Sequence, residues 1–412
     1  MKQLALAKIR QNFPRPRIED VAAAIEQQMQ RFAPGVRQGM SIAVTAGSRG
    51  ITGIPLILRT IVDSLRSMGA EPFIVAAMGS HGGGTAEGQR QVLHHLGIDE
   101  NAVGAPLRIT SEAVAAGVTE GGHTLFVDRE ALRADAIFAV NRVKLHTAFQ
   151  DKLASGLFKM LTVGLGKVPG ATQVHKLSSS GMYTSIVEMG RLALGKLPVL
   201  GGLALVENGY EETAWVEALL PAEMEEGEKK LLQYAAGLLP RLPVRQLDVL
   251  IVEEMGKNFS GTGMDTNVIG RWKATGFPEP EWPRIRRIVV LRLSKESDGN
   301  ANGLGLADVT TKKLVEAIDW DATLMNVQTT GFWDRAFCPP FPGNDHDAIS
   351  WALKGMKVSE DQAVSVARVR NTLHLGEFWL NETAFASAEM CERMSDYMPL
   401  SFDGRGNLQP GQ

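Results

Sequence analysis

The sequence predicts an α/β protein of two domains, each a mostly parallel sheet covered by helices, with the active-site cleft between them. Along the first half, near-continuous apolar segments of strand length alternate with helical patterns, which is typical of βαβ units. A chain of 412 residues matches two domains at roughly 100–200 residues each. The composition, 44% hydrophobic and 22% charged, supplies enough apolar material for two cores and excludes general disorder.

The first domain is expected to span residues 1–240. Apolar residues at helical spacing predict a helix over Ile54–Met68, and a second helix is expected through Gln91–Leu96. The predicted strands share near-continuous apolar composition and are Ser41–Ala46, Pro72–Met78, Ala134–Val143 and Gly202–Glu207.

The second domain is expected to span residues 241–412. The charge-rich stretch EEGEKKLLQYAAGLLPRLP, ending at Pro243, is interpreted as a linker helix, which places the boundary near 240. Beyond it, alternating segments predict strands and helical spacing predicts a helix near Thr311–Ile318 and a terminal helix over Glu382–Met394. The strands expected here are Leu247–Glu253, Arg287–Leu293, Ala363–Arg368 and Glu377–Leu380.

Charge and cysteine content narrow the class of protein. The net charge of −3 argues against a nucleic-acid or membrane-surface partner. The two cysteines, Cys338 and Cys391, have no paired metal spacing and form no disulfide framework, as expected in a reducing compartment. The N-terminal segment lacks a signal-peptide pattern, and no apolar run approaches the ~20 residues that a bilayer needs. We therefore expect a cytoplasmic globular protein.

Two common cofactor motifs are missing from the sequence. The segment GLGKVPG at 164–170 has one residue too many for the dinucleotide fingerprint, and GLGLAD at 303–308 lacks its last glycine. No Walker A motif occurs either. These features argue against a nicotinamide dehydrogenase and a P-loop enzyme.

Two histidines follow predicted strands directly. His81 lies in GSHGGG after the second strand, and His146 lies in KLHTAF after the third. Because ligands collect at the carboxyl ends of parallel strands, we expect both histidines to face one cleft. Gly82 and Gly83 would let the backbone approach a ligand, and Thr85 could cap the following helix. The guanidinium of Arg49 is a candidate to bind a carboxylate or phosphate through two N–H groups. A solvated loop histidine and a tight turn are the plainer alternatives.

The segment 155–175, SGLFKMLTVGLGKVPGATQVH, is the most unusual in the chain. Lys159 stands among apolar residues there, and a lysine in such a setting can serve as a nucleophile or covalent anchor. A helix-surface lysine whose head reaches solvent is the commoner alternative. His175 closes the same segment, sixteen residues after Lys159.

These motifs, in this order, resemble the nickel-dependent lactate racemase family. The resemblance runs over residues 41–176 and rests on MGSHGGGT around His81, on LHTAFQDKLASGLFK with His146 and Lys159, and on His175. A Thr-Arg-Pro element of the family is matched by Ser48-Arg49-Gly50. The family's aspartate before the arginine is absent, since Ala46, Gly47 and Ser48 occupy that stretch.

The resemblance implies a nickel pincer nucleotide, a pyridinium mononucleotide bearing nickel, attached through a thioamide to Lys159, with His175 as the protein ligand of nickel. Imidazole suits Ni(II). His81 and His146 would be the acid/base pair on opposite faces of the substrate, and Arg49 would hold the substrate carboxylate. The other cofactor-binding positions implied are Ser48, Arg49, Gly82, Gly83 and Gly156.

The implied reaction is racemisation or epimerisation of a 2-hydroxy acid. One histidine removes the hydroxyl proton while hydride leaves Cα for the cofactor, and return of hydride to the other face inverts the centre. An ordinary pKa near 6.5 suits histidine to both directions of proton transfer. In the second domain, the polar loops 257–267 and 295–308 are expected to face the cleft, with Lys295 as a carboxylate-binding candidate.

The partners implied are a small hydroxy acid and the proteins that make the cofactor, and a homodimer is compatible with the sequence. Two other functions stay open. One is a metal-dependent hydrolase in which His81, His146 and His175 bind the metal directly. The other is a non-catalytic protein that binds a sugar acid or a nucleotide. The departures from the family motif leave lactate itself unassigned as the substrate.

Overall fold

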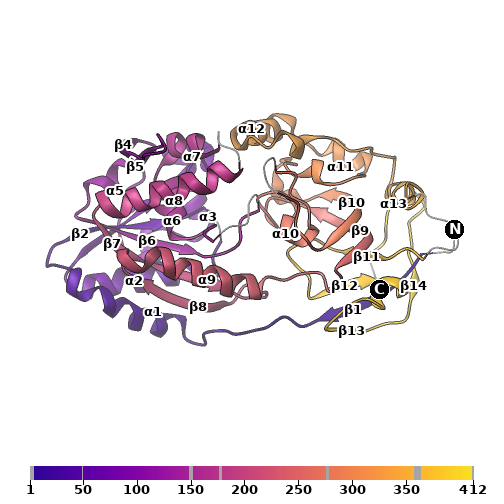
Figure 1. Ribbon diagram of the computed structural model, residues 1–412, viewed down its shortest axis with the longest axis horizontal. Helices are drawn as coiled ribbons and strands as arrows, with labels where there is room; N and C mark the ends of the chain where they lie inside the picture. The colour runs from indigo at the N-terminus through magenta and orange to yellow at the C-terminus, as the bar shows by residue number, and fades with distance from the viewer. Residues whose placement is uncertain are drawn as a thin grey trace. The chain divides into compact units, whose positions relative to one another are not determined.

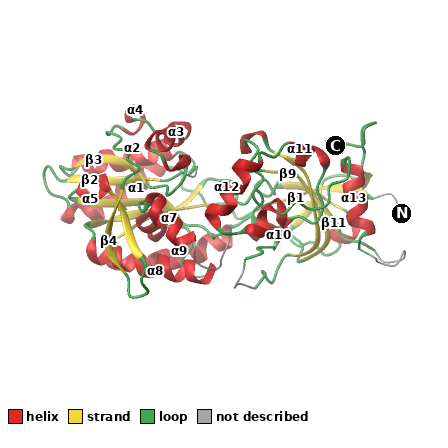
Figure 2. Ribbon diagram, turned by 90° about the horizontal axis from the view of Figure 1, so that it is seen from above, coloured by secondary structure: helices red, strands yellow, loops and turns green. Residues whose placement is uncertain are grey.

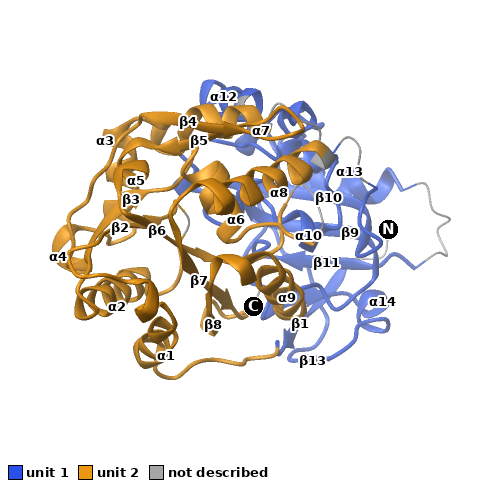
Figure 3. Cartoon of the chain, turned by 60° about the vertical axis from the view of Figure 1, so that its left-hand side comes forward, with its two compact units in different colours: residues 1–13, 240–412 blue, residues 14–239 orange. Residues whose placement is uncertain are grey.

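The computed structural model describes residues 4–48, 50–147, 152–175, 179–274, 278–356 and 363–410. The chain divides into two compact units, shown in separate colours in Figure 3. Unit 2 comprises Pro14–Leu239, and unit 1 comprises Met1–Phe13 together with Pro240–Gln412. The expected assignment of the N-terminus to the first domain is therefore corrected: the first 13 residues belong with the C-terminal part of the chain, because β1 (Ala5–Gln11) pairs there with β12 (Glu377–Leu380).

Unit 2 is built on a five-stranded sheet with the order β3-β2-β6-β7-β8. Strands β2, β6, β7 and β8 are labelled in Figure 1. The first four strands are mutually parallel, and β8 runs antiparallel to β7. The bounds are β2 Ser41–Ala46, β3 Glu71–Ala76, β6 Ala136–Arg142, β7 Val199–Glu207 and β8 Thr213–Leu219. All four predicted strands are present, so this sheet confirms the α/β class.

Helices cover both faces of this sheet (Figure 3). Helices α1 and α2 pack on one face, where the apolar stripe of α2 (Ile57, Ile61 and Leu65) meets Val44 of β2. Helices α6 and α9 contact β7 on the other face. The helix bounds are α1 Val21–Met29, α2 Ile54–Ser67, α3 Ala86–His95, α4 Glu100–Val103, α5 Arg129–Arg133, α6 Leu157–Lys159, α7 Lys167–His175, α8 Ser179–Lys196 and α9 Met224–Leu238.

A separate two-stranded ribbon lies beside α7 and α8 (Figure 2). It consists of β4 (Ala113–Val118) and β5 (Thr124–Asp128), which pair antiparallel. The interpretation of residues 225–243 as a linker helix is also corrected. Helix α9 belongs to unit 2, because its apolar side, including Leu231 and Leu232, is buried in that unit.

Unit 1 carries a mixed sheet with the order β10-β9-β11-β12-β1-β13, and β14 also pairs with β1. Pairing is parallel only among β10, β9 and β11, and the remaining strands pair antiparallel. Alternate residues of β9 enter two different cores, Leu250 and Val252 on one face and Val249 and Ile251 on the other. The strand therefore reads as continuously apolar. The strand bounds are β9 Gln246–Met255, β10 Arg284–Leu293, β11 Val366–Val369, β12 Glu377–Leu380, β13 Cys391–Arg393 and β14 Met398–Pro399.

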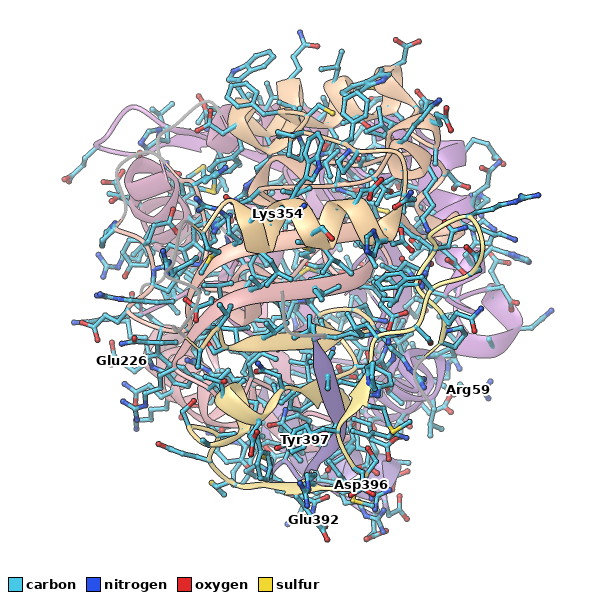
Figure 4. All side chains as sticks on the ribbon, turned by 90° about the vertical axis from the view of Figure 1, so that its right-hand side faces the viewer. Arg59, Glu226, Lys354, Glu392, Asp396 and Tyr397 are labelled. Atoms are coloured by element: carbon cyan, nitrogen blue, oxygen red, sulfur yellow. The ribbon has the colours of Figure 1, made fainter. Side chains whose placement is uncertain are left out.

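Within the described residues, unit 1 contains the α-helices α10 to α14. The exposed end of α13 carries Lys354 (Figure 4). The bounds are α10 Thr266–Ile269, α11 Lys312–Glu316, α12 Trp320–Thr330, α13 Asp345–Lys354 and α14 Glu382–Phe385. The predicted terminal helix over 382–394 is wrong beyond Phe385, because Cys391–Arg393 forms β13 against β1. Within the described residues, no helix is long and apolar enough to cross a membrane.

Candidate functional site

The loops that follow β2, β3, β6 and β7 meet at the carboxyl edge of the unit 2 sheet. Ser48 Oγ lies 3.1 Å from His81 Nδ1, which joins the first two loops. The amide N–H of Gly79 donates to the Gly164 carbonyl at 3.0 Å, and that of Thr52 donates to Glu207 Oε1 at 2.7 Å. Parallel strands place such loops together, and this edge is where α/β folds bind ligands.

His81 lies in a glycine-rich turn between β3 and α3. Gly82, Gly83 and Gly84 all have positive φ, between 64° and 68°, which side chains with a Cβ rarely adopt. Thr85 Oγ1 accepts from the N–H of Gly88 at 3.0 Å, which confirms the predicted cap of α3. The turn thus presents an exposed His81 at the edge of the sheet.

The His81 ring has a defined hydrogen-bonding partner. Its Nδ1 lies 2.8 Å from the carbonyl oxygen of Met78. A carbonyl oxygen only accepts, so Nδ1 carries the proton in this contact and the neutral ring has its lone pair on Nε2. This arrangement makes Nε2 the atom that could take a proton from a ligand.

Behind the turn lies a buried polar network that sequence reasoning missed. Lys167 Nζ lies 2.8 Å from Asp128 Oδ2, and it donates to the Ala76 carbonyl at 2.5 Å and to Gln89 Oε1 at 3.0 Å. Gln89 Nε2 in turn donates to the Gly79 carbonyl at 2.9 Å. The network therefore ties the turn to the ends of β3 and β5. In the sequence, only the position of Lys167 within the GLGKVPG segment hints at it.

The two ends of the loop after β6 are hydrogen-bonded to each other through their backbones. Lys144 and Ser155 exchange N–H···O bonds at 2.9 and 3.2 Å, so residues 144 and 155 lie side by side. Asn141 Nδ2 donates to the Gly156 carbonyl at 2.9 Å and holds the end of the loop against β6. His146 lies on this loop and is half-buried.

Lys159 ends the short helix α6 and precedes a π-helical turn over Met160–Gly164. Its neighbours Phe158 and Met160 are buried, whereas Lys159 itself is half-buried. The carboxylate of Glu228 on α9 accepts from the N–H of Phe158 at 3.0 Å. π-Helical turns occur frequently at functional sites.

Glu228 is a further group that sequence reasoning missed. Burial raises the pKa of Glu228 to about 7, although hydrogen bonds from the N–H groups of Phe158 and Leu157 oppose the rise. A Cβ at Gly156 would collide with this carboxylate, so a glycine there lets Glu228 approach the start of α6. Gly156 thus has a local structural role next to its expected role in cofactor binding.

An ion pair between Arg142 and Glu207 joins the carboxyl ends of β6 and β7. The Glu207 side chain is almost completely buried, and it also accepts from the N–H of Thr52. The sequence placed both residues at strand ends without indicating that they pair.

A cavity of about 690 Å³ opens between the loop after β6 and helix α9. Of the predicted site residues whose side chains the structure describes, His146 is the one that lines it. Within the described residues, the lining consists of Leu145, His146, Lys152, Ala154, Glu226, Lys229, Lys230, Leu232, Gln233 and Ala236. Its volume lies within the range of ligand sites, about 300–1,000 Å³.

Three other predicted site residues either lie outside the described residues or belong to unit 1. Arg49 lies outside the described residues, and His175 is the last residue of α7 with a side chain that also lies outside them. Lys295 is exposed in unit 1, within a short 3₁₀ helix after β10. In the described parts of the chain, no group of three or more His, Cys, Asp or Glu side chains could hold a metal ion.

Comparisons with known proteins identify a solved structure with a similar fold and a family whose model matches the chain. The fold is similar to that of the lactate racemase apoprotein from Thermoanaerobacterium thermosaccharolyticum, with a TM-score of 0.53 over 90% of this chain and 99% of that chain. Sequence identity is 11%, so the likeness is one of fold. The chain belongs to the family described as a domain of unknown function (DUF362), whose model matches residues 42–262. No curated protein matches the chain.

Proposed function

We propose that the protein is a racemase or epimerase of a 2-hydroxy acid, with its reaction centre at the carboxyl edge of the unit 2 sheet. The observation that carries the proposal is the His81 contact with the Met78 carbonyl at 2.8 Å, which fixes the tautomer of a histidine exposed at that edge. The shared fold with a lactate racemase apoprotein supports the same class of reaction.

His81 acts as the base for one enantiomer. With Nδ1–H committed to Met78, Nε2 accepts the hydroxyl proton of the substrate, and the carbonyl then stabilises the imidazolium that forms. Ser48 Oγ, 3.1 Å from Nδ1, supports the same ring orientation. Histidine suits this role because its ordinary pKa lies near 6.5, so proton gain and loss both cost little.

His146 serves the opposite enantiomer. It stands on the loop after the neighbouring strand β6 and lines the cavity beside α9. A second proton donor and acceptor is needed because the two enantiomers present their hydroxyls to opposite sides. Backbone pairing between Lys144 and Ser155 fixes the base of the loop that carries it.

The nickel pincer nucleotide is the cofactor expected from the sequence, and the surroundings of Lys159 fit it. Lys159 is half-buried between buried apolar neighbours, and the Glu228 carboxylate orders the start of its helix. Lys159 would hold the cofactor through Nζ, and His175 would supply an imidazole to the nickel. When bound, the group would take hydride from Cα and return it to either face.

The test begins with intact-protein mass and metal analysis of protein made in a host that supplies nickel and the cofactor pathway. We expect a mononucleotide-sized adduct on Lys159 and about one nickel per chain. Lys159→Ala should carry no adduct, whereas His81→Ala should carry it. Chiral chromatography should then measure the conversion of one enantiomer of the substrate into the other. We expect His81→Ala to lose this conversion and His94→Ala, a matched change of an exposed histidine on α3, to retain it.

Each outcome bears on one part of the proposal. An unmodified mass with stoichiometric metal would favour a hydrolase with direct metal ligands. Neither adduct nor metal, in a host shown to load a related protein, would favour a binding protein. An adduct that persists in Lys159→Ala would refute the anchoring role.

A further inference from the structure

The cavity beside α9 combines a catalytic candidate with an excess of positive charge. Among the residues that the structure describes, four charged side chains line it, three lysines and one glutamate, so positive charges outnumber negative ones by two in this set. They are Lys152, Lys229, Lys230 and Glu226. His146 occupies the side of the cavity that belongs to the loop after β6.

The positive charges come largely from one face of α9. Glu226, Lys229, Lys230 and Gln233 are spaced three and four residues apart, so they share one side of the helix. The apolar residues of the same helix, such as Leu231, are buried in the unit. Glu226 is exposed and projects outward in Figure 4.

The two lysines on α9 differ in their surroundings. Lys229 Nζ lies 2.7 Å from Glu225 Oε1 and 2.6 Å from Glu226 Oε1, and the hydrogen bond to Glu225 raises the pKa of Lys229. Lys230 is exposed and makes no ion pair with any residue that the structure describes. A charge without a partner at the wall of a cavity favours an anionic ligand.

The size of the cavity indicates a ligand longer than lactate. From Glu226 to Ala236 the lining follows α9 for ten residues, about 15 Å at 1.5 Å per residue. A three-carbon acid held at His146 would leave most of that length empty. Leu145, Ala154 and Leu232 offer apolar contact to a carbon skeleton in between.

We propose that this cavity binds the far end of a 2-hydroxy acid that carries a second anionic group, a carboxylate or a phosphate, with Lys230 as the principal contact. The hydroxyl end lies toward His146 and the second anion toward α9. The assignment rests on the proposed function for the role of His146, but the binding of a dianion does not depend on turnover.

The test is calorimetric titration of the full-length protein with three acids: lactate with one anionic group, malate with two carboxylates, and 3-phosphoglycerate with a carboxylate and a phosphate. We expect malate and 3-phosphoglycerate, which each carry a second anionic group, to bind at least tenfold more tightly than lactate, and less tightly as salt is raised from 50 to 500 mM. Lys230→Gln should weaken the binding of both acids about tenfold, a loss of one charged contact, and leave the binding of lactate unchanged.

Lys196→Gln, an exposed lysine at the end of α8, is the matched control and should bind all three acids like the wild type. The His146 ring signals in NMR, assigned by their loss in His146→Gln, should shift when malate binds. Equal affinity for lactate and malate, or malate binding that Lys230→Gln leaves intact, overturns the proposal. So does inorganic phosphate binding as tightly as malate without moving the His146 signals.

The two proposals fail in different ways. Lysine-dependent binding of malate without any racemisation would support the dianion site and refute the racemase. Racemisation of lactate by a protein that binds mono- and dianionic acids equally would support the racemase and overturn the dianion site.

Discussion

Lys167 and Asp128 form an ion pair that solvent does not reach. Nζ and Oδ2 lie 2.8 Å apart, and the two side chains are 1% and 0% exposed. Burial lowers the pKa of Lys167 and raises the pKa of Asp128, while their mutual attraction opposes both shifts. The desolvation of the two buried charges offsets much of their attraction, so the pair adds little net stability. Its main effect is to hold the groups around it in place. Lys167 also bonds the Ala76 carbonyl and Gln89, and thereby fixes the turn that carries His81.

Lys167→Met should destabilise the protein, because it leaves Asp128 buried without its partner. We expect a loss of about 3–5 kcal/mol in the free energy of unfolding, measured with urea. Amide exchange at Gly79 and His81 should quicken, since Gln89 loses the group that orients it. The exposed Lys196→Met should change neither quantity.

The double variant Lys167→Met/Asp128→Asn separates charge from packing. Asparagine is neutral, yet its side-chain oxygen can still accept from the N–H groups of Glu130 and Ala131, as Asp128 does. Part of the lost stability should therefore return. If the double variant is no more stable than Lys167→Met, an unpaired carboxylate is not the cause of the loss.

Local sequence patterns predicted most of the unit 2 sheet. The strand at Ser41–Ala46 and the helix from Ile54 were predicted to within a residue, because a buried strand and an amphipathic helix both have a regular apolar spacing. Pairings between distant segments could not be predicted. Ile9 pairs with Phe378, which lies near the other end of the sequence, and no periodic pattern in the sequence indicates that contact. The strand at Cys391 depends on the same edge.

In the candidate site, too, local features could be predicted from the sequence, whereas contacts between distant segments could not. The glycine turn and the strand-end position of His81 are local features, and the structure joins His81 to Ser48 as neighbouring loops require. Glu228 contacts Phe158, 70 residues away, and Lys167 contacts Asp128 and Ala76, 39 and 91 residues away, so their roles emerge only in the fold. Lys295 lies in unit 1 and remains a prediction from the sequence.

Gly82 and Gly83 offer a matched pair for testing the turn. Both have positive φ, 65° and 64°, so alanine is strained at either position by about 1–2 kcal/mol. At Gly82 a Cβ would also lie 2.5 Å from the Gly88 carbonyl carbon and 2.6 Å from the Gln89 N, whereas at Gly83 nothing lies within 4 Å. Gly82→Ala should therefore lose more stability and displace His81. We expect Gly83→Ala to keep the NMR signals of His81 and Gly82→Ala to move them. If the two alanine variants lose equal stability and shift the His81 signals equally, the backbone around Gly82 accommodates the added Cβ at no cost in stability.

Glu228 should make stability depend on pH between about 4.5 and 7. The ordinary pKa of a glutamate is 4.5 and burial raises that of Glu228 to about 7, so over this interval the unfolded chain releases the proton and the folded protein keeps it. Its contribution is therefore fully present below pH 4.5 and is lost as the pH rises through 7. The loss amounts to about 3 kcal/mol.

Glu228→Gln stays neutral throughout, so its stability relative to the wild type should rise by that amount between pH 4.5 and pH 8. Urea unfolding of both proteins at several pH values measures the difference, in which all other titrating groups cancel. Glu26→Gln, an exposed change on α1, should follow the wild-type curve. Parallel curves for Glu228→Gln and the wild type would show that the Glu228 carboxyl titrates near its ordinary pKa. In that case the Phe158 and Leu157 N–H groups would stabilise the buried carboxylate enough to offset its desolvation.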